Sequence, residues 1–365
     1  MLKVLHIINS LDFGGAETLL KESLPLFKEK GIDCDVLVLR KSNSGYEEFL
    51  KGHNIDIFYS NIKNIYNPLQ ISFITNFLNK NEYDVVHSHP FPSQYWVSLA
   101  KTLTSNKKVK FVTTEHNTSN GRRGKKIFYF LDKLIYSQYK KIICISEGTK
   151  RELVKWVPDT FEKAYIIENG VNLNKFINSK PLNRTDLIPT YRDGDKLILM
   201  TARLTEQKDH QTVINAASEL PNNIHFLFAG DGEKRKEYET IVEEKNLTHR
   251  IHFLGMRPDV ERIIKTVDLF VLSSHYEGFG LVAVEAMASG IPVIASNVSG
   301  LAEVVNEAGI LFDKGNHKAL ISAINELVID NNSYAEAKHK GIDRSKKYSL
   351  SVFVDNHINL YNNIL

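Results

Sequence analysis

The sequence predicts an α/β protein with two doubly wound domains, each built on a parallel sheet. Short runs rich in β-branched and aromatic residues alternate with amphipathic helical patterns throughout, which is typical of βαβ units. The runs are apolar at nearly every position, as expected of strands that helices cover on both faces. A length of 365 residues is enough for about two domains and a sizeable core.

The first domain is expected to contain a series of short buried strands separated by helical patterns such as AETLLKESLPLFKEK. In chain order the strands are KVLHII (from Lys3), DVLVLR (from Asp35), IDIFYS (from Ile55), DVVHSH (from Asp84), KFVTTEH (from Lys110), KIICIS (from Lys141) and AYIIENG (from Ala164). The polar stretch 171–195 then interrupts the alternation with Pro181, Pro189 and Gly194, and this predicts a hinge and connector.

The alternation restarts with KLILMTARL, HFLFAGDG, IHFLGM, DLFVLSS, PVIAS and GILF, each followed by a helical pattern. We therefore expect a first domain at 1–170, a second at 171–345 and a C-terminal helix within 346–365. Such sheets bind ligands outside the carboxyl ends of their strands. The natural site of two such domains is the cleft between them.

Composition narrows the class of protein. A net charge of +3 is too small to indicate a nucleic-acid partner. Cys34 and Cys144 lie in apolar runs, so a disulfide framework is not expected and a reducing cytoplasm fits. The segment MLKVLHIINS does not resemble a signal peptide, and no run of about eighteen apolar residues predicts a membrane span.

The stretch YEGFGLVAVEAM places two glutamates around a glycine turn directly after a predicted buried strand. Gly278 and Gly280 permit a tight turn and close backbone approach to a ligand, and the helix from Leu281 offers unpaired amides to an anion. Glu285, one turn into that helix, suits ribose hydroxyls, and Glu277 suits a second sugar. The alternative is a pair of solvated glutamates on an ordinary turn.

Two cations follow the first strand of the second domain, in TARLTEQKDH. Arg203 ends the strand and Lys208 precedes a helix, a placement that suits a diphosphate. Two unrelated surface cations are the alternative. The DxD patterns at Asp33 and Asp193 are interpreted as turn residues before strands, so the cations would take the role of a metal in stabilising a leaving diphosphate.

Three further features carry weaker signals. Gly14 and Gly15 stand between the first strand and the first helix, where backbone can approach an anion or simply form a loop. AGDGE lacks a full GxGxxG and a suitably spaced acidic residue, which argues against a dehydrogenase. His116 ends the fifth strand and either faces the cleft or has a structural role.

The segment from Lys101 to Lys155 is strongly basic. Its RRGKKIFYFLDKLIYSQYKK interleaves aromatic residues with cations at helical spacing, which suits an anionic membrane surface. The cations at the start of this aromatic stretch are Arg122, Arg123, Lys125 and Lys126. The alternative is a helix that buries Phe128, Leu131 and Ile135 and solvates its lysines.

Taken together, these motifs resemble those of the retaining glycosyltransferases of family 4, which have the GT-B fold of two Rossmann-like domains. The resemblance rests on the Glu-x7-Glu pair, RLTEQK, AGDGE, FLGMRPDV, the GGAE loop and EHN, and it covers essentially the whole chain. The head VLHIINSLDFGGAETLL is most similar to members that build bacterial capsule, exopolysaccharide or O-antigen units.

The resemblance implies a role for each matching position. Glu285 would bind the ribose and Glu277 the donor sugar, while Arg203 and Lys208 would clamp the diphosphate. His116 would lie beside the transferred sugar. The family usually has glycine after the clamp lysine, where this chain has Asp209. Backbone and loop positions implied to line the donor are Gly14, Gly15, Gly230, Met256, Arg257, Gly278, Phe279, Gly280 and Leu281.

The expected function is therefore that of a cytoplasmic, retaining, metal-independent hexosyltransferase without a cofactor. Its first domain would bind the acceptor and its second the nucleotide sugar, with UDP favoured over GDP, and the C-terminal helix would return to the first domain. The expected acceptor is a polyprenyl-diphosphate-linked glycan at the inner face of the membrane. A nucleotide-sugar 2-epimerase and a catalytically idle sugar-nucleotide-binding subunit are the rival hypotheses.

Overall fold

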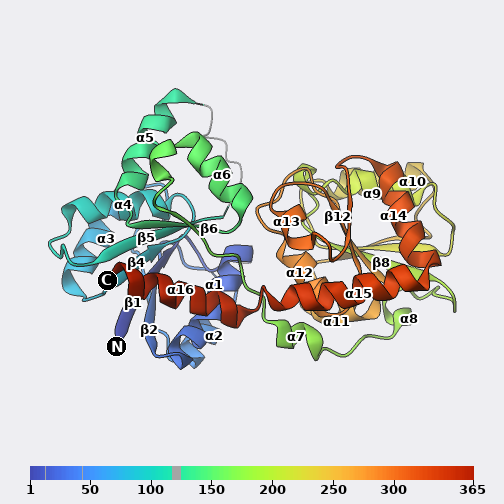
Figure 1. The fold of residues 1–365 in the computed structure, drawn as a ribbon, viewed down its shortest axis with the longest axis horizontal. Helices are drawn as coiled ribbons and strands as arrows, with labels where there is room; N and C mark the ends of the chain where they lie inside the picture. The colour runs from blue at the N-terminus through green and yellow to red at the C-terminus, as the bar shows by residue number, and fades with distance from the viewer. Residues whose placement is uncertain (13, 43, 117–124) are drawn as a thin grey trace. The chain divides into compact units, whose positions relative to one another are not determined.

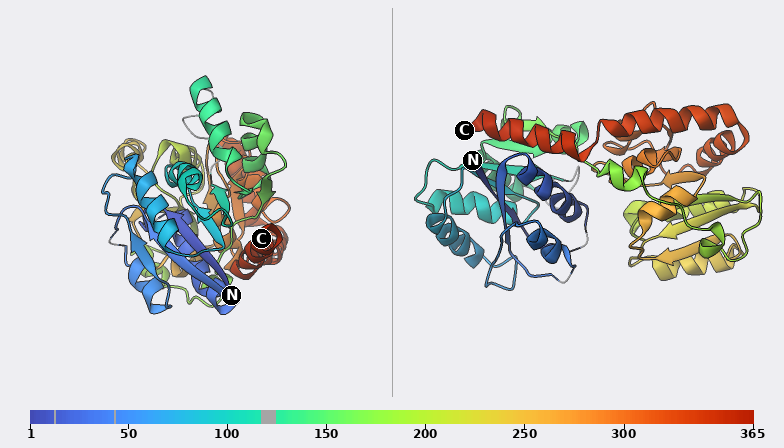
Figure 2. Two further views of the ribbon diagram at one scale, coloured as in Figure 1. Left: turned by 90° about the vertical axis from the view of Figure 1, so that its left-hand side faces the viewer. Right: turned by 90° about the horizontal axis from the view of Figure 1, so that it is seen from below.

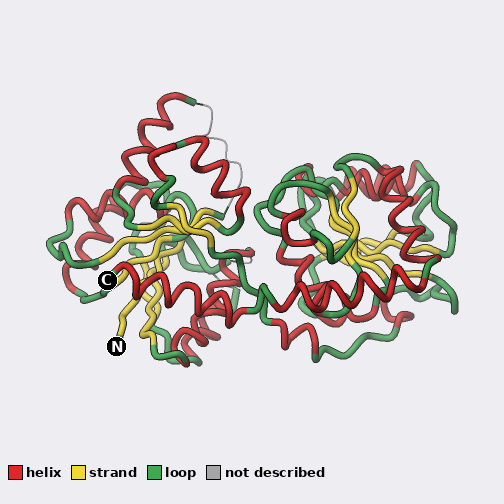
Figure 3. Tube along the Cα trace, viewed as in Figure 1, coloured by secondary structure: helices red, strands yellow, loops and turns green. Residues whose placement is uncertain are grey.

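The computed structural model describes residues 1–12, 14–42, 44–116 and 125–365, which form two compact units (Figure 1). Unit 1 comprises Met1–Gly170 with Leu350–Leu365, and unit 2 comprises Val171–Ser349. Each unit is a parallel sheet with helices packed on both faces (Figure 3). This confirms the predicted fold class of two doubly wound, Rossmann-like domains.

Unit 1 contains a seven-stranded parallel sheet in the order β3-β2-β1-β4-β5-β6-β7. The strands are β1 (Leu2–Ile8), β2 (Ile32–Val38), β3 (Ile57–Tyr59), β4 (Val85–Ser88), β5 (Lys110–Glu115), β6 (Lys141–Cys144) and β7 (Ala164–Ile166). The helices are α1 (Gly15–Glu29), α2 (Tyr46–Gly52), α3 (Leu69–Lys80), α4 (Ser93–Leu103), α5 (Lys126–Ser137), α6 (Glu147–Trp156), the 3-10 turn η1 (Pro158–Thr160) and α16 (Leu350–Ile364).

Strand alternation divides the unit 1 core into two layers. Leu5 and Ile7 of β1 face the layer that also contains the buried residues of α3 and α4. Val4 and Ile8 face the opposite layer, with α1 and α16. Helix α16, the red C-terminal helix in Figure 2, thus completes one face of the first sheet.

Unit 2 repeats the plan with a six-stranded parallel sheet in the order β10-β9-β8-β11-β12-β13. The strands are β8 (Lys196–Thr201), β9 (Ile224–Ala229), β10 (Ile251–Gly255), β11 (Leu269–Leu272), β12 (Val293–Ser296) and β13 (Ile310–Phe312). The main helices are α9 (His210–Ala217), α10 (Arg235–Glu244), α11 (Val260–Thr266), α12 (Leu281–Ala288), α13 (Leu301–Val305), α14 (His317–Ile329) and α15 (Asn331–Lys346), with the 3-10 turn η2 (Glu206–Lys208).

The strand order reverses at one place in each sheet. In unit 1 this switch point lies between β1 and β4, and in unit 2 it lies between β8 and β11. Chains leaving the two central strands there run to opposite sides, which opens a crevice at the carboxyl ends. These two edges are therefore where the fold favours ligand sites.

The segment expected to be a hinge and connector contains two short helices that its polar composition did not predict. They are α7 (Leu173–Ile177) and α8 (Arg184–Leu187). Phe176 is buried, and the Arg184 guanidinium makes two hydrogen bonds, at 3.0 and 2.9 Å, to the Asp268 carboxylate. Such long-range contacts attach the segment to unit 2, and a local period could not reveal them.

The two DxD patterns have different positions. Asp193 lies in a turn before β8, as expected. Asp33 and Asp35 lie inside β2, so their interpretation as turn residues is wrong. Tyr83 donates a 2.7 Å hydrogen bond to buried Asp35, and burial raises the pKa of that carboxyl group. The hydrogen bond from Tyr83 explains how a buried position of the strand tolerates this carboxylate.

Candidate active site

The unit 2 switch point brings together two of the residues selected from sequence. Lys208, in η2 after β8, pairs directly with Glu277, in the turn after β11. The side chains are only 17% and 9% exposed, respectively. Ser274 Oγ donates a 3.0 Å hydrogen bond to the paired oxygen, Glu277 Oε1. The predicted diphosphate cation and the predicted sugar carboxylate therefore form one largely buried charge pair.

Two hydrogen bonds hold the two loops of this pair against each other. The His275 amide donates to the Gln207 carbonyl at 2.8 Å, and Gln207 Nε2 donates to the Tyr276 carbonyl at 2.9 Å. These contacts fix the approach of η2 to the β11–α12 turn without using either charged side chain. The geometry of Lys208 and Glu277 is thus supported by the fold around them.

Asp209 occupies a position whose backbone favours glycine, with φ 44° and ψ 47°. Its carboxylate caps α9, accepting from the Thr212 amide at 3.3 Å and from the Thr212 hydroxyl at 2.8 Å. Ser273, just beyond β11, donates to it at 3.1 Å. The side chain that replaces the family's usual glycine therefore ties the Lys208 loop to the neighbouring strand.

The glycine turn between Glu277 and α12 exposes backbone at the switch point. Gly280 has φ 91°, and a Cβ there would lie 2.6 Å from Leu301 Cδ1. Phe279 turns its ring inward against Tyr348, with ring centroids 5.3 Å apart. Helix α12 starts at Leu281 without a side-chain cap. Its first amides and the 278–280 backbone are therefore suited to an anion.

The remaining predicted donor residues are distributed along the same sheet. Glu285 is half-buried in α12, one turn beyond Leu281. Arg203 follows β8 with an exposed side chain. Met256 follows β10 and is 66% exposed, whereas Arg257 forms a bidentate pair with Asp259 at 2.8 and 2.6 Å. Because the Arg257 guanidinium is committed to Asp259, its backbone rather than its side chain suits a ligand.

Gly230 has a structural reason to be glycine. It follows β9 with φ 148°, and a Cβ would lie 2.0 Å from the Ala202 carbonyl oxygen. Its amide donates to the Gly255 carbonyl at 2.9 Å. The chain that leaves β8 passes so close to position 230 that a side chain there would collide with it, which explains why the residue is glycine. Its predicted role in donor binding remains a prediction.

The unit 1 residues gather at the carboxyl edge of the first sheet. Gly14 and Gly15 open α1, and a Cβ at Gly14 would lie 2.3 Å from Glu17 Oε2. His116 directly follows β5, and its Nε2 is buried without a hydrogen-bond partner among the described residues. Burial lowers the pKa of His116 to about 4. At neutral pH this imidazole is uncharged, so it can exchange hydrogen bonds but not supply a positive charge.

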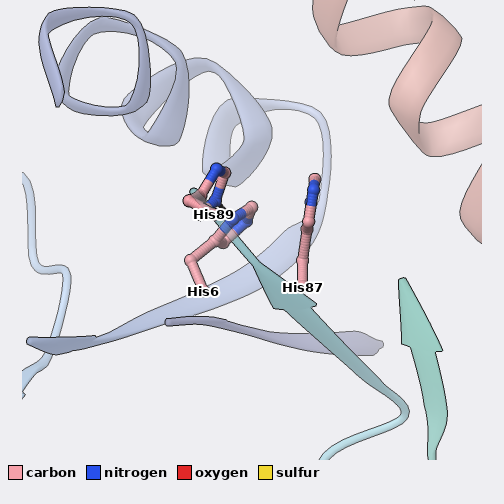
Figure 4. A group of neighbouring side chains, drawn as sticks. All are labelled: His6, His87 and His89. Carbon is pink, nitrogen blue, oxygen red and sulfur yellow. Dashed lines mark hydrogen bonds between the residues drawn. The ribbon is translucent and has the colours of Figure 1, made fainter. Parts of the chain in front are cut away.

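The sequence analysis missed a cluster of buried histidines at the unit 1 switch point. His6 of β1, His87 of β4 and His89 just beyond it project from the same face of the sheet (Figure 4). Burial, followed by the nearby His357, lowers the pKa of His6 to about 3. Burial also lowers the pKa values of His87 and His89. The signal available in the sequence was the alternating HSH pattern, because residues i and i+2 of a strand share a face.

The basic surface predicted to contact membrane is only partly described. Arg122 and Arg123 lie outside the described residues, while Lys125 and Lys126 are exposed at the start of α5. Helix α5 buries Ile135 against unit 1, as one hypothesis expected, but it leaves Leu131 exposed. Ile127, Phe130 and Leu134 are 76%, 69% and 53% exposed. No described helix is long and apolar enough to cross a membrane.

Both units have the topology of GT-B glycosyltransferases. The structure of Anabaena HepE in complex with UDP and glucose matches with a TM-score of 0.85 at 19% identity, over 100% of both chains. The model of Glycosyltransferase Family 4 matches residues 13–175, and that of Glycosyl transferases group 1 matches residues 188–344. The chain belongs to glycosyltransferase family 4, as its motifs predicted.

Two relatives support this assignment. An uncharacterized glycosyltransferase of Methanocaldococcus jannaschii is 30% identical over 285 residues, covering 75% of this chain and 74% of that protein. A Campylobacter jejuni enzyme is 23% identical over 366 residues, covering 95% of this chain and 96% of that protein. Its name describes a 4-α-N-acetylgalactosaminyltransferase acting on N-acetylgalactosamine-N,N'-diacetylbacillosaminyl-diphospho-undecaprenol.

Proposed function

We propose that this glycosyltransferase transfers a sugar from a UDP-sugar to a polyprenyl-diphosphate-linked glycan, with retention of configuration, in the synthesis of a bacterial surface polysaccharide. The observation that carries the proposal is the Lys208–Glu277 pair beside the uncapped α12 terminus at the unit 2 switch point. Binding of UDP by Anabaena HepE supports the choice of base. The acceptor named for the Campylobacter relative supports a lipid diphosphate.

The charge pair suits exchange of partners when a donor binds. Lys208 would leave Glu277 for the diphosphate, and Glu277 would then accept hydrogen bonds from sugar hydroxyls. Arg203 supplies the second cation of the clamp. Because these cations stabilise charge that develops on the leaving diphosphate, the transfer requires no metal ion or other cofactor at that group.

The proposed reaction proceeds by attack on the same face that the diphosphate leaves. The acceptor hydroxyl forms the new glycosidic bond as the sugar–phosphate bond breaks, and the leaving phosphate takes the hydroxyl proton. Neutral His116 would hold a hydroxyl of the transferred sugar. The positions of donor and acceptor supply the main catalytic advantage, because a fixed geometry replaces a bimolecular encounter.

The lipid acceptor requires access to a membrane surface, and α5 is the proposed contact. Exposed Ile127, Phe130 and Leu134 would enter the headgroup region, while Lys125 and Lys126 attract anionic lipid. Sedimentation with vesicles tests this contact. Phe130→Ser should weaken binding to phosphatidylglycerol vesicles, whereas the matched change Ile329→Ser at a 78% exposed site of α14 should not.

The deciding experiment for the reaction combines purified protein, a panel of UDP- and GDP-sugars and a polyprenyl-diphosphate glycan, with and without EDTA. We expect one UDP-sugar to yield an extended lipid glycan with the anomeric configuration of the donor, unaffected by EDTA. Release of an epimer without acceptor would instead identify a 2-epimerase. Donor binding without turnover under any condition would identify a binding subunit. Loss of transfer in EDTA would overturn the metal-independent clamp.

A further inference from the structure

The three switch-point histidines of unit 1 derive their arrangement from strand register. His6 and His87 are directly paired across the parallel strands β1 and β4. His89 follows two residues after His87, and its amide donates to the Ile7 carbonyl at 2.9 Å. Pleating places all three rings on the face covered by α1 and α16. One ring nitrogen from each histidine lies within 4.8 Å of the other two.

A small cavity adjoins these rings. Its volume is about 20 Å³, and its lining includes His6, His87, His89 and His116 together with residues of α1 and α16. That volume is enough for about one water-sized group. Two buried ring nitrogens, His6 Nε2 and His89 Nδ1, have no hydrogen-bond partner among the described residues. Unsatisfied buried polar atoms beside a cavity are costly unless a ligand or water occupies the space.

We propose that His6, His87 and His89 form a binding site for one divalent transition-metal ion of the zinc class, separate from the donor site. Neutral imidazole is a preferred ligand of Zn²⁺, Cu²⁺ and Ni²⁺. Three imidazoles with one further position for a water make up a four-coordinate zinc site.

The spacing of the nitrogens suits such an ion. His6 Nδ1 and His89 Nε2 are 3.1 Å apart, while two tetrahedral ligands at about 2.0–2.1 Å from zinc lie roughly 3.3 Å apart. The ion would replace the single proton that these two nitrogens share, and that proton would move to the far nitrogen of its own ring. His6 Nε2 and His89 Nδ1 would then both carry protons, which a water in the cavity could accept in hydrogen bonds. Little movement of either ring is needed for this substitution.

His87 is the ligand that must exchange a partner. Its Nδ1 lies 2.7 Å from the Tyr361 hydroxyl, and its Nε2 lies 2.7 Å from Thr114 Oγ1. One nitrogen would turn from its hydroxyl to the metal, and the other would keep its hydroxyl as an outer partner. Such outer partners fix the orientation of a ligating ring. The bound ion would thus link β1 to β4 beneath α1 and α16.

The site also lies next to the predicted active-site histidine. The ring centroids of His89 and His116 are 6.0 Å apart. An ion on the three histidines would therefore stiffen the layer on which His116 rests. Because the metal would bind the folded state in preference to the unfolded chain, it should raise thermal stability in proportion to the logarithm of its free concentration.

The test is a titration of metal-free, full-length protein with Co²⁺, added both to the folded chain and during refolding. We expect one ion per chain with the intense visible absorption of tetrahedral cobalt, displacement by Zn²⁺, and three imidazole ligands by X-ray absorption spectroscopy. Absence of tetrahedral cobalt under both loading conditions would overturn the proposal. So would an ion with fewer than three imidazole ligands.

Variants locate the ion. His89→Gln should weaken Co²⁺ binding by more than the roughly 10- to 100-fold that loss of an outer partner costs. The control is His252→Gln, which removes a close histidine pair in unit 2, where His225 Nδ1 and His252 Nε2 are 3.4 Å apart. Loss of binding in the control with retention in His89→Gln would place the ion elsewhere and overturn the proposal. If His89→Gln does not fold, the ligand count on wild-type protein decides alone.

Discussion

Lys208 and Glu277 form a direct ion pair that joins the exits of β8 and β11, and Ser274 holds the same carboxylate oxygen at 3.0 Å. The two side chains are separated by 69 positions in the chain. Their pairing means that the two charges of the proposed donor site are already in place and satisfy each other. A bound donor must offer both residues better partners than they offer each other.

Neutralising one member of this pair should remove transfer while leaving the fold intact. We expect Lys208→Met to lower kcat by about 100- to 1,000-fold, because one donor to the developing charge is lost. Glu277→Gln should reduce activity as well, by weakening its hold on the sugar. Steady-state kinetics and circular dichroism measure both properties.

The control for this experiment is the exposed ion pair of Lys318 with Glu219, whose side chains are 67% and 39% exposed. Lys318→Met should change neither kcat nor the melting temperature appreciably, because exposed pairs contribute little. Wild-type turnover in Lys208→Met or Glu277→Gln would remove the pair from the active site.

Substitutions of Asp209 should separate the effect of its backbone conformation on stability from the effect of its side chain. Asp209→Ala loses the cap of α9 and keeps a left-handed residue, so we expect a loss of about 1–3 kcal/mol in stability. Asp209→Gly loses the same hydrogen bonds but relieves the backbone, so it should cost clearly less. Urea unfolding of the two variants provides the comparison, and equal losses would contradict this account.

Gly280 should be far less tolerant of a side chain than another glycine with similar backbone. Gly280→Ala combines positive φ with a Cβ 2.6 Å from Leu301, whereas Gly315→Ala has φ 77° and no neighbour within 4 Å. We expect Gly280→Ala to lower both stability and UDP affinity, because the start of α12 must shift. Gly315→Ala should show only the backbone strain, about 1 kcal/mol. UDP affinity is measured by calorimetric titration. Normal binding of UDP by Gly280→Ala would show that the donor site does not depend on this turn.

Buried neutral histidines should make the protein sensitive to mild acid. Burial lowers the pKa of His116 and of His357 to about 4 each, below the value of about 6.5 in an unfolded chain. Between these values only the unfolded chain takes up the proton. The stabilising contribution is therefore full above pH 6.5 and is lost as pH falls toward 4.

Each such histidine should lower the free energy of unfolding by about 1.4 kcal/mol per pH unit below pH 6.5. Asp132 acts in the opposite direction, since burial raises its pKa to about 6. Urea unfolding from pH 8 to 5 should show a net fall in stability that His357→Gln makes shallower. An unchanged slope in that variant, with an unchanged transition width, would contradict this assignment.

The strands of both sheets were predictable from the sequence because each is a short apolar run between polar segments. KVLHII and KLILMTARL correspond to β1 and β8, and the turn after DLFVLSS leads into α12 as expected. The family motifs also selected Lys208 and Glu277, which the structure places side by side, and their role as donor residues remains a prediction. Local pattern suffices for such features, because burial and backbone preference act over a few residues.

The partnerships between distant residues could be decided only by the tertiary structure. Nothing in TEQKDH or YEGFG states that Lys208 and Glu277 touch, that Asp209 caps α9 while holding Ser273, or that α7 and α8 pack on unit 2. The HSH pattern likewise acquires meaning only when β4 pairs beside His6 of β1. Strand order and register set these contacts, and both depend on the packing of the whole sheet rather than on neighbouring residues.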